Sequence, residues 1–543
     1  MLGNDAWIGC CVQIMSGVTV GSHAIVGEVV ARNFPERQVV GGVPARVIHK
    51  RNRYTRPLRP LKFGIWKVSK SNTGMRSAAL MQFGSKYVSM GAQLVITAVL
   101  ARLISPGDFG LMAIVTVFTG LFSLFSDMGV GTAIVQYRDL TEREYGGLFA
   151  FSALLAAGLS LVFCAASPCI AAVYGDARLV PLCLASAPAL LFSTLNMVPN
   201  GLMLKELRFA AIGVRLVAAT VVSGGVAIAA SALGAGCYAL VLQTVLSAAV
   251  VFFWNIVARP IRQINAHFIC TLKKIFSYSA YQFGFSLVNY FSRNLDNMLV
   301  GGMQGTAALG FYDKAYKLTT YPMTAFSSVI GSVIQPFMAE HQDDVDRIYE
   351  CWMRIEKLLS LVGVAVAVVF SCASAEIIAV FYGPGWEQAV PVFAVLALSV
   401  YFQMMGNPSG AFFQSIGRTD YMFKVGLVNT AITISGLLAG LAGGSILTVA
   451  YGIFAAYCLH MVPLAYFLVK RGFGRPYYCL LNFLPEIAVG IVGIAAVAGV
   501  GAFIPMEDVF LSLIVKLLVS SIALITGYAL TGQLKYLMAL IKR

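Results

Sequence analysis

The sequence is short of charged residues, which make up 12% of its 543 positions, about half the share found in an ordinary soluble domain. It contains no C-x-x-C pair and no Cys/His grouping at metal-ligand spacing, so its eleven cysteines predict neither a structural zinc site nor a disulfide framework. The N-terminus lacks the basic and apolar pattern of a signal peptide, and the first apolar span is expected to act as the targeting signal. These absences exclude zinc-stabilised domains and disulfide-rich secreted proteins.

What the sequence has in abundance is apolar residues, which form 58% of the chain, and an excess of Lys and Arg that gives a net charge of +15. A soluble core could not bury so much apolar surface, so lipid is the expected solvent for most of it. In a soluble protein this charge would favour nucleic acid, but no aromatic and basic recognition motif accompanies it. We therefore expect a membrane protein without a nucleic-acid partner.

The apolar pattern restarts halfway along the chain. Gln82-Phe83-Gly84 opens the first apolar stretch, Gln282-Phe283-Gly284 opens the seventh, and Gly110 and Gly310 follow at the same spacing. A membrane protein made of two similar halves is typically a transporter, because a site between the halves can open to either side in turn. Transport is accordingly the first functional hypothesis.

The predicted fold class is an all-α integral membrane protein of about fourteen transmembrane helices. We expect two parallel six-helix lobes and two extra helices. Each apolar stretch is long enough to cross about 30 Å of hydrocarbon. The spans are expected at 78–101, 109–133, 148–173, 180–204, 211–233, 237–258, 276–303, 312–338, 357–382, 389–415, 421–441, 446–469, 484–504 and 509–531.

Loop charges predict the orientation of these spans. Loops after even-numbered spans are rich in Lys and Arg, whereas the opposite loops are short and nearly free of them, with Arg102, Arg178, Lys314 and Lys317 as exceptions. This pattern places both termini in the cytoplasm and requires an even number of spans. Six spans separate the two Gln-Phe-Gly elements, so the halves share one orientation and are related by an axis along the membrane normal.

Residues 1–50 follow a different pattern. Aliphatic residues recur every six positions from Ile8 to Val26, and three such hexads make one turn of a left-handed β-helix. The tail Gly41-Gly42-Val43-Pro44-Ala45-Arg46-Val47-Ile48 resembles the C-terminal end of hexapeptide-repeat sugar acyltransferases. The catalytic His of that family lies upstream of the last coils, so His23 is not expected to be catalytic and the fragment is expected to be inactive.

The chain is expected to divide into seven segments. The stretch 343–359, with apolar residues at helical spacing, is expected to form an amphipathic helix on the inner membrane surface. The segments are a β-helix fragment at 1–50, a basic cytoplasmic linker at 51–77, a six-helix lobe at 78–258, a cytoplasmic connector at 259–275, a second six-helix lobe at 276–469, two further helices at 484–531 and a cytoplasmic tail at 532–543.

An ionic cluster lies inside the seventh span, at Arg293-Asn294-Leu295-Asp296-Asn297. Ionisable groups within a span are costly, and by default they mark a pathway or a site. Arg293 and Asp296 are three residues apart on one helical face, so they could simply neutralise each other inside the bundle. Alternatively, Arg293 lines a central cavity, where its planar fork suits a phosphate, and Asp296 orients it or takes up a cation.

Other polar residues lie in the first, second and fifth spans. Lys86 follows Gln82 by one helical turn and is expected to line the cavity. Gln82 and Gln282 occupy equivalent places in the halves, where they could bond across the interface or contact sugar hydroxyls. Asp127 has either a packing role or a coupling role, and Arg215 either snorkels to the cytoplasmic surface or lines the cavity.

Four segments resemble the Wzx-type polysaccharide flippases of the multidrug/oligosaccharidyl-lipid/polysaccharide (MOP) exporter superfamily. The resemblance covers about residues 70–480 and implies that an oligosaccharide linked to undecaprenyl diphosphate, a polysaccharide or lipopolysaccharide precursor, is moved from the cytoplasmic to the outer leaflet. The segments are SYSAYQFG at 277–284, RNLDNMLVG at 293–301, LGFY at 309–312 and VLARLISPGDFG at 99–110.

The same resemblance implies a MATE-like fold in a bacterial inner membrane, and a transporter that is not an enzyme and holds no cofactor. Arg293 and Lys86 are expected to contact the diphosphate or a sugar acid, with Arg102 as a further candidate near the outer side. Coupling to H⁺ or Na⁺ through Asp296 or Asp127 stays open. Membrane lipids, a polysaccharide polymerase and export machinery are the expected partners besides the lipid-linked oligosaccharide.

Two rival functions remain. A drug/cation antiporter of the same superfamily would carry more acidic than basic residues in its cavity, whereas bases are at least as prominent here. A membrane-anchored sugar O-acetyltransferase would use residues 1–50, which lack the coils and the upstream His that such enzymes need. Deletion of residues 1–60 separates this second rival from transport.

Overall fold

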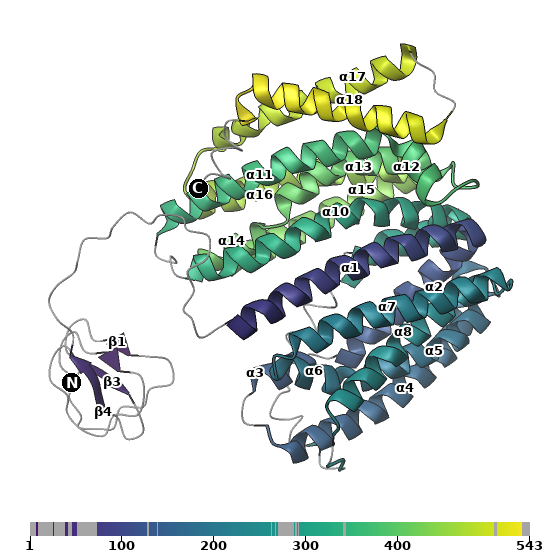
Figure 1. The fold of residues 1–543 in the computed structure, drawn as a ribbon, viewed down its shortest axis with the longest axis vertical. Helices are drawn as coiled ribbons and strands as arrows, with labels where there is room; N and C mark the ends of the chain where they lie inside the picture. Colours follow the sequence, from purple (N-terminus) through teal and green to yellow (C-terminus); the bar gives the residue numbers. More distant parts are fainter. Residues whose placement is uncertain are drawn as a thin grey trace. The chain divides into compact units, whose positions relative to one another are not determined.

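The structure is a computed structural model, and its described residues divide into two compact units, within residues 1–67 and within residues 68–542 (Figure 1). Each unit is considered by itself. The described residues are 7–8, 25–26, 38–41, 46–50 and 73–534, except 128–129, 138–139, 262, 266–267, 270–286, 288–289, 292, 340–343 and 504–507.

The described part of the first unit is a small sheet. Its strands follow the order β1 to β4, with β1, β2 and β3 parallel and β4 antiparallel to β3. Trp7 pairs with Ile25, so the chain advances eighteen residues, or three hexads, between β1 and β2. The strands are β1 (Trp7–Ile8), β2 (Ile25–Val26), β3 (Gln38–Gly41) and β4 (Arg46–Lys50).

The second unit is helical and has two lobes. The N-terminal lobe contains α1 (Thr73–Leu103), α2 (Pro106–Asp127), α3 (Val130–Gln136), α4 (Glu142–Tyr174), α5 (Leu179–Leu195), α6 (Met197–Lys205), α7 (Phe209–Ala232) and α8 (Cys237–Ala258). The C-terminal lobe contains the helical residues 293–304, α10 (Thr306–Ala339), α11 (Val345–Cys372), α12 (Ser374–Phe381), α13 (Ala389–Gly406), α14 (Ser409–Ser415), α15 (Thr419–Ala442), α16 (Ile446–Leu464) and the π-helical η1 (Ala465–Gly472). The 3₁₀ helix η2 (Tyr477–Phe483), α17 (Leu484–Phe503) and α18 (Val509–Leu530) follow.

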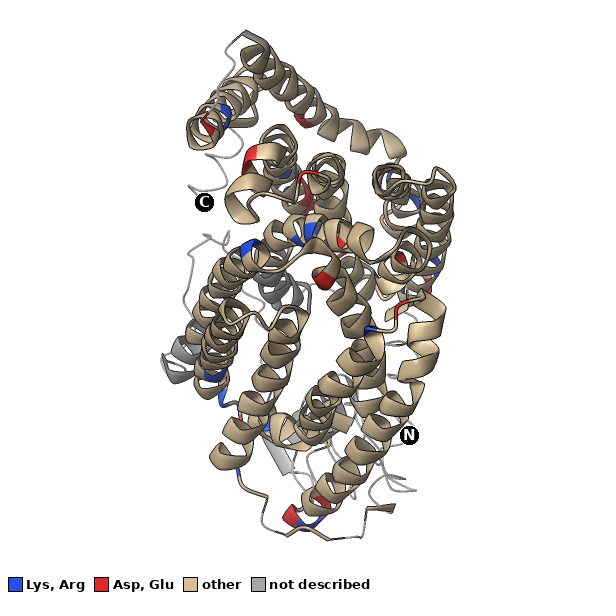
Figure 2. Ribbon diagram, turned by 90° about the vertical axis from the view of Figure 1, so that its right-hand side faces the viewer, with Lys and Arg blue, Asp and Glu red and all other residues tan. Residues whose placement is uncertain are grey.

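This architecture confirms a multi-pass, all-helical membrane unit. Among the described residues, eleven helices are long and apolar enough to cross a membrane, and they match predicted spans two to six and nine to fourteen. Most of their length carries no charged residue (Figure 2). Two further helices, α1 and α10, coincide with predicted spans one and eight.

One sequence expectation is wrong. The stretch 343–359 is no separate surface helix, because α11 runs without a break from Val345 to Cys372. The carboxylate of Asp344 caps its start by accepting the backbone N–H of Arg347 at 3.1 Å. The apolar face of this first part is covered by protein, since Ile348 and Trp352 are 0% and 1% exposed and pack beside Phe412 and Leu468. An apolar helical stripe alone does not say whether lipid or protein covers it.

The lobes meet where α2 and α10 begin. A Cβ atom on Gly110 would overlap the backbone carbonyl of Thr306, and one on Gly310 would overlap the carbonyl of Pro106. Each helix therefore lies against the backbone of the other through a glycine, as close packing of membrane helices requires. The two glycines that the sequence repeat placed in register thus face each other, and we call this contact the Gly110/Gly310 junction.

Aromatic side chains surround the junction. The ring of Trp386, 1% exposed, has its centroid 5.6 Å from that of Phe109 and 5.8 Å from that of Phe311. Its indole N–H donates to the carbonyl of Ala101 at 2.9 Å, which joins the end of α1 to the loop before α13. The buried Lys314 has its ammonium 4.1 Å from the centre of the Phe109 ring. The two lobes are therefore sealed at this end by a dry, tightly packed contact.

The repeat extends to the loops beside the junction. The N-terminal lobe carries Tyr174-Gly175 before Val180-Pro181, and the C-terminal lobe carries Tyr382-Gly383 before Val390-Pro391. Both glycines have positive φ, 67° and 80°. Both tyrosine hydroxyls donate to a backbone carbonyl in the C-terminal lobe, that of Met298 at 3.3 Å and that of Lys314 at 3.2 Å. The two lobes thus repeat each other in local backbone detail.

Candidate functional site

The ionic cluster predicted in the seventh span lies on the helical residues 293–304. Asp296 is buried, and its carboxylate accepts the hydroxyl of Tyr312 at 2.9 Å and the backbone N–H of Asn297 at 2.8 Å. Arg293 is exposed, and among the described residues no ion pair joins it to Asp296. The carboxylate is instead held by Tyr312 and Asn297, and Arg293 forms no ion pair with a described residue.

A polar and aromatic network continues from Asp296 through the C-terminal lobe. The ring of Tyr312 stacks on that of Tyr316, with centroids 6.1 Å apart and planes at 16°. The hydroxyl of Tyr316 lies 3.1 Å from that of Tyr457 on α16, and the Tyr457 ring contacts the His460 ring at 5.3 Å. Arg293 is close enough to Tyr316 and Tyr457 to interact with them electrostatically. Arg293 and Asp296 therefore both lie beside the same network of tyrosine side chains.

The remaining candidates have separate surroundings. Lys86 is exposed on α1, one residue before Tyr87, whose hydroxyl donates to the carbonyl of Ala325 on α10 at 2.8 Å. Arg102 donates to the carbonyl of Val380 on α12 at 2.7 Å, so it ties the end of α1 to the C-terminal lobe. Gln282 lies outside the described residues, as do the side chains of Gln82 and Asp127.

The N-terminal lobe contains a polar pocket that the sequence analysis missed. It has a volume of about 520 Å³ and lies between α1, α5, α7 and α8. One lining residue, Gln93, stands eleven positions after Gln82, as Arg293 stands eleven positions after Gln282. The described lining residues are Gln93, Ala189, Ser193, Asn196, Thr220, Ser223, Gln243, Thr244, Ser247, Ala248 and Val251. The signal in the sequence was polar residues at helical spacing, such as Gln243 and Ser247.

A buried arginine supports one wall of this pocket. The guanidinium of Arg215 donates to the side-chain oxygens of Asn200 at 3.1 Å and Asn255 at 2.6 Å. The amide of Asn255 in turn donates to the side-chain oxygen of Asn196 at 2.7 Å. Arg215 is 8% exposed, so it neither snorkels nor lines a cavity, and both readings of the sequence are wrong. Through Asn255 it is linked by hydrogen bonds to Asn196.

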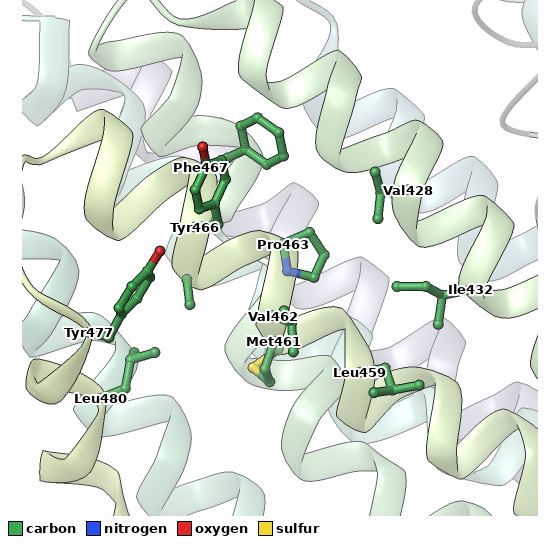
Figure 3. Close-up of a pocket in the computed structure, with 11 residues that line it drawn as sticks. Val428, Ile432, Leu459, Met461, Val462, Pro463, Tyr466, Phe467, Tyr477 and Leu480 are labelled. Carbon is green, nitrogen blue, oxygen red and sulfur yellow. The ribbon is translucent and has the colours of Figure 1, made fainter.

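An apolar groove of about 830 Å³ lies on the C-terminal lobe (Figure 3). Figure 3 shows Val428 and Ile432 of α15 across from the kinked end of α16, where Pro463 precedes the π-helical turn η1. Tyr477 also lines the groove and has the ammonium of Lys470 5.0 Å from its ring centre. Such a surface suits a hydrocarbon chain whose polar end lies near a cation.

Several buried ionic groups escaped the sequence analysis. Glu356 and Glu486 are fully buried, and Lys357 forms an ion pair with Glu486 between α11 and α17. Lys516 of α18 pairs with Glu376 of α12 at 2.6 Å. Each is an ionisable residue within an apolar stretch, and this feature of the sequence could have predicted a buried ionic contact. These pairs attach the last two helices to the C-terminal lobe.

The described residues contain no group of three or more His, Cys, Asp or Glu side chains that could hold a metal ion. In the loop between α4 and α5, the Arg178 guanidinium pairs with the Asp176 carboxylate at 2.7 Å. The hydrogen bond from Arg178 lowers the pKa of Asp176, and the same bond raises the pKa of Arg178.

Known proteins similar to the membrane unit are concentrated in one family. A family model described as polysaccharide biosynthesis protein matches residues 99–391, more than half of the chain. The teichuronic acid biosynthesis protein TuaB of Bacillus subtilis is 27% identical over 373 residues, 67% of this chain and 77% of that protein. The lipopolysaccharide biosynthesis protein WzxC of Escherichia coli is 26% identical over 423 residues, 73% of this chain and 82% of that protein.

Solved structures show the same fold. The lipid II flippase MurJ in an inward closed conformation has a TM-score of 0.68 at 12% identity, over 84% of this chain and 99% of that chain. An inward-facing multidrug resistance MATE family transporter of the MOP superfamily has a TM-score of 0.56 at 16% identity, over 76% and 96%. These likenesses confirm the predicted MATE-like two-lobed arrangement.

The N-terminal segment has a relative of a different kind. The galactoside O-acetyltransferase of Escherichia coli is 42% identical over 53 residues, which cover 9% of this chain and 26% of that enzyme. This confirms the likeness to a sugar acyltransferase, and the enzyme is about four times longer than the match. For the membrane unit the family match is decisive: the chain belongs to the polysaccharide biosynthesis protein family.

Proposed function

We propose that this protein flips an oligosaccharide linked to undecaprenyl diphosphate from the cytoplasmic to the outer leaflet of the inner membrane. The observation that carries the proposal is Arg293, an exposed arginine without a described acidic partner on a helix inside the membrane unit. A cation in that position is costly unless water or an anion meets it, and its planar fork suits a diphosphate. The family and the names of its relatives support this cargo.

The route uses alternating access between the lobes. We count the eleven apolar helices, α1, α10 and one span that includes the helical residues 293–304 as fourteen spans, and we place both termini in the cytoplasm. In that orientation the Gly110/Gly310 junction lies at the outer side, so the described state is closed to the outside. Export requires this junction to open after the cytoplasmic side has closed.

The cargo divides according to its chemistry. The diphosphate meets Arg293 and Lys86 in a wet central cavity, while the polyprenyl chain stays in lipid or along the apolar groove of Figure 3. Asp296 and the network behind it provide a place where H⁺ or Na⁺ uptake could be coupled to movement of the 293–304 helix. A polymerase and export machinery then receive the sugar outside.

The N-terminal segment takes no part in transport in this proposal. The eighteen-residue step from Trp7 to Ile25 fits one turn of a left-handed β-helix, and the likeness to the acetyltransferase covers 26% of that enzyme. We therefore regard it as an inactive acyltransferase fragment. Deletion of residues 1–60 is expected to leave export unchanged, whereas loss of acetylated sugar with normal export would assign it an activity.

The test is deletion of the gene in a strain without a second flippase. Lipid-linked repeat units should accumulate in the inner leaflet, and surface polysaccharide should disappear. Complementation with Arg293→Ala should fail at normal protein level, while Arg354→Ala, which removes an exposed arginine paired with Glu350 elsewhere, should restore export. Normal surface polysaccharide in the deletion strain would refute the proposed function.

A further inference from the structure

The polar pocket of the N-terminal lobe is unusual because it lies halfway along two apolar helices. It lies near the middle of α7 and α8, where Thr220, Ser223, Gln243 and Ser247 line it. Polar side chains facing lipid at this depth would lack hydrogen-bond partners, at a cost of several kcal/mol for each unsatisfied group. A hollow with this polar lining therefore suits water or a hydrophilic ligand better than a lipid chain.

Its chemistry selects against most ligands. Eight of the described lining residues are polar and none is charged, so the pocket offers no counter-charge to a phosphate or a carboxylate. A volume of about 520 Å³ is far larger than a bare cation needs and falls in the range of sites for small organic ligands. What remains is a neutral molecule rich in hydroxyl or amide groups.

The lining offers both donors and acceptors to such a molecule. The hydroxyls of Thr220 and Thr244 donate to their own helices, at 2.9 Å to Leu216 and 2.8 Å to Leu240, so their oxygens remain as acceptors. The amide of Gln243 has no hydrogen bond to a described residue and supplies two donors and an acceptor. Adjacent hydroxyls of a sugar ring, which both donate and accept, match this arrangement.

The pocket is also held in shape before a ligand arrives. Asn196 is fixed by Asn255, which is fixed in turn by the buried Arg215. A side chain positioned in this way loses little entropy on binding. Arg215 is thus a positioning residue for this wall of the pocket.

We infer that this pocket binds a neutral sugar ring of the carried oligosaccharide, while the diphosphate is held by the C-terminal lobe at Arg293. The inference rests on the proposed function and adds to it the place and the class of the sugar contact. Gln93 and Arg293, at equivalent positions of the repeat, then divide one cargo between them, hydroxyls to the amide and phosphate to the guanidinium.

The test compares two probes on the purified full chain in lipid nanodiscs. One is undecaprenyl diphosphate without sugar, and the other is the oligosaccharide-linked lipid extracted from the same bacterium. The pocket variants are Gln243→Leu, which removes an amide, and Ser247→Phe, which fills the hollow. The control is Gln403→Leu, which removes an amide of the C-terminal lobe that donates to Ser399 at 2.8 Å.

Wild type and the control should bind the glycosylated probe more tightly than the bare one. Gln243→Leu should reduce affinity for the glycosylated probe about three- to tenfold, as loss of one or two hydrogen bonds implies. Ser247→Phe should abolish the preference altogether. Both variants should bind the bare diphosphate lipid as wild type does, which shows that they are folded.

The outcomes separate the two proposals. Binding of neither probe by wild type would overturn the proposed function, and loss of both probes on Arg293→Ala alone would support it. If the pocket variants keep the full preference for the glycosylated probe, the pocket holds only water and the inference on the sugar site is wrong.

Discussion

The two lobes share a backbone frame but differ at their centres. In the N-terminal lobe, the middle of α8 presents Gln243, Thr244 and Ser247 to a hollow of about 520 Å³. In the C-terminal lobe, α16 presents Tyr457 and His460, whose rings contact each other and whose polar atoms lie within hydrogen-bond distance of Tyr316 on α10 and Thr433 on α15. Small polar residues line a hollow in the N-terminal lobe, whereas aromatic side chains pack together in the C-terminal lobe.

This difference separates the parts of the repeat that are alike in both lobes from the parts that are not. Where the lobes touch, the repeat is kept: Gly110 faces the start of α10, Gly310 faces the start of α2, and both Tyr-Gly loops bond to a helix of the C-terminal lobe. Away from that contact, Gln93 and Arg293 differ in charge at equivalent positions. The shared parts serve closure of the transporter, and the divergent parts serve contact with an asymmetric cargo.

The largest effect is expected at the junction. Gly110→Ala and Gly310→Ala each place a methyl group into the backbone of the other helix. Overpacking of this kind costs about 1–3 kcal/mol or more, so the outward-closed state should lose about 10- to 100-fold in population. Spin labels at Ala177 and Gln388, in a cysteine-free background, should report a longer distance, and export should fall by a similar factor.

The control for the junction is Gly107→Ala, because a Cβ there meets nothing nearer than the Ser105 hydroxyl oxygen at 3.9 Å. It should behave as wild type, although all three changes raise helix propensity. The symmetry of the repeat predicts equal effects for Gly110 and Gly310. If only one of the two substitutions opens the outer end, the junction is not the symmetric contact described above.

The second effect tests the hydrogen-bond network around Asp296 in the C-terminal lobe. Asp296→Asn keeps an acceptor for Tyr312 and removes the buried charge, so export should fall about tenfold and should lose its dependence on a proton or sodium gradient. Tyr312→Phe, which leaves the carboxylate without its hydroxyl partner, should give a weaker form of the same defect, a fall in export of about two- to fivefold, because one hydrogen bond contributes about 0.5–1 kcal/mol. Export is measured as surface polysaccharide at controlled external pH and sodium concentration.

Asp346→Asn is the matched change outside this network, since Asp346 pairs with Arg475 and is 78% exposed. It should leave export unchanged. An Asp296→Asn protein that retains both its rate and its response to the gradient would leave the network with a packing role only.

The membrane fold could be predicted because its determinants are local. Apolar length and loop charge each act over about twenty residues or fewer, and together with the repeated Gln-Phe-Gly element they predicted the lobes and eleven of the spans. The exceptions to the loop-charge rule have a physical reason. Arg178 pairs with Asp176, Lys317 pairs with Asp313 at 2.8 Å and Arg102 is bound to Val380, so these bases interact with protein groups.

The sites were predicted less well because they depend on contacts between helices. Arg293 and Asp296 were singled out, but their separation followed from Tyr312, sixteen residues further along the chain from Asp296. The environment of Arg215 depends on Asn255, forty residues away, and no spacing rule joins them. The polar pocket combines four helices, each of which contributes only one to five lining residues.

A third, smaller effect tests whether Arg215 holds one wall of the polar pocket in the N-terminal lobe. Arg215→Met removes both hydrogen bonds of the guanidinium and leaves the oxygen of Asn255 buried without this donor. Such a loss costs about 1–3 kcal/mol, which for a protein of this size corresponds to a fall of a few degrees in the unfolding temperature. Binding of the glycosylated lipid should weaken as well, because Asn196 loses its support. Unchanged stability and unchanged sugar preference would show that Arg215 does not position this wall.

The smallest effect is expected in the equivalent loops beside the junction, where only the N-terminal lobe has an ion pair, between Asp176 and Arg178. Because this pair lowers the pKa of Asp176, the carboxylate stabilises the fold at pH values above the usual aspartate range near about 3.9, and the contribution is lost as the pH falls through the lowered pKa. Asp176→Asn should therefore destabilise the protein at pH 7 by about 0.2–1 kcal/mol, the usual range for a surface ion pair, and the difference from wild type should vanish at strongly acidic pH.

Glu387 in the loop of the C-terminal lobe accepts the backbone N–H of Gly385 at 2.9 Å and has no described ion pair. Glu387→Gln should consequently show less dependence on salt than Asp176→Asn when thermal unfolding is followed at low and high ionic strength, because screening weakens an ion pair more than a hydrogen bond to the backbone.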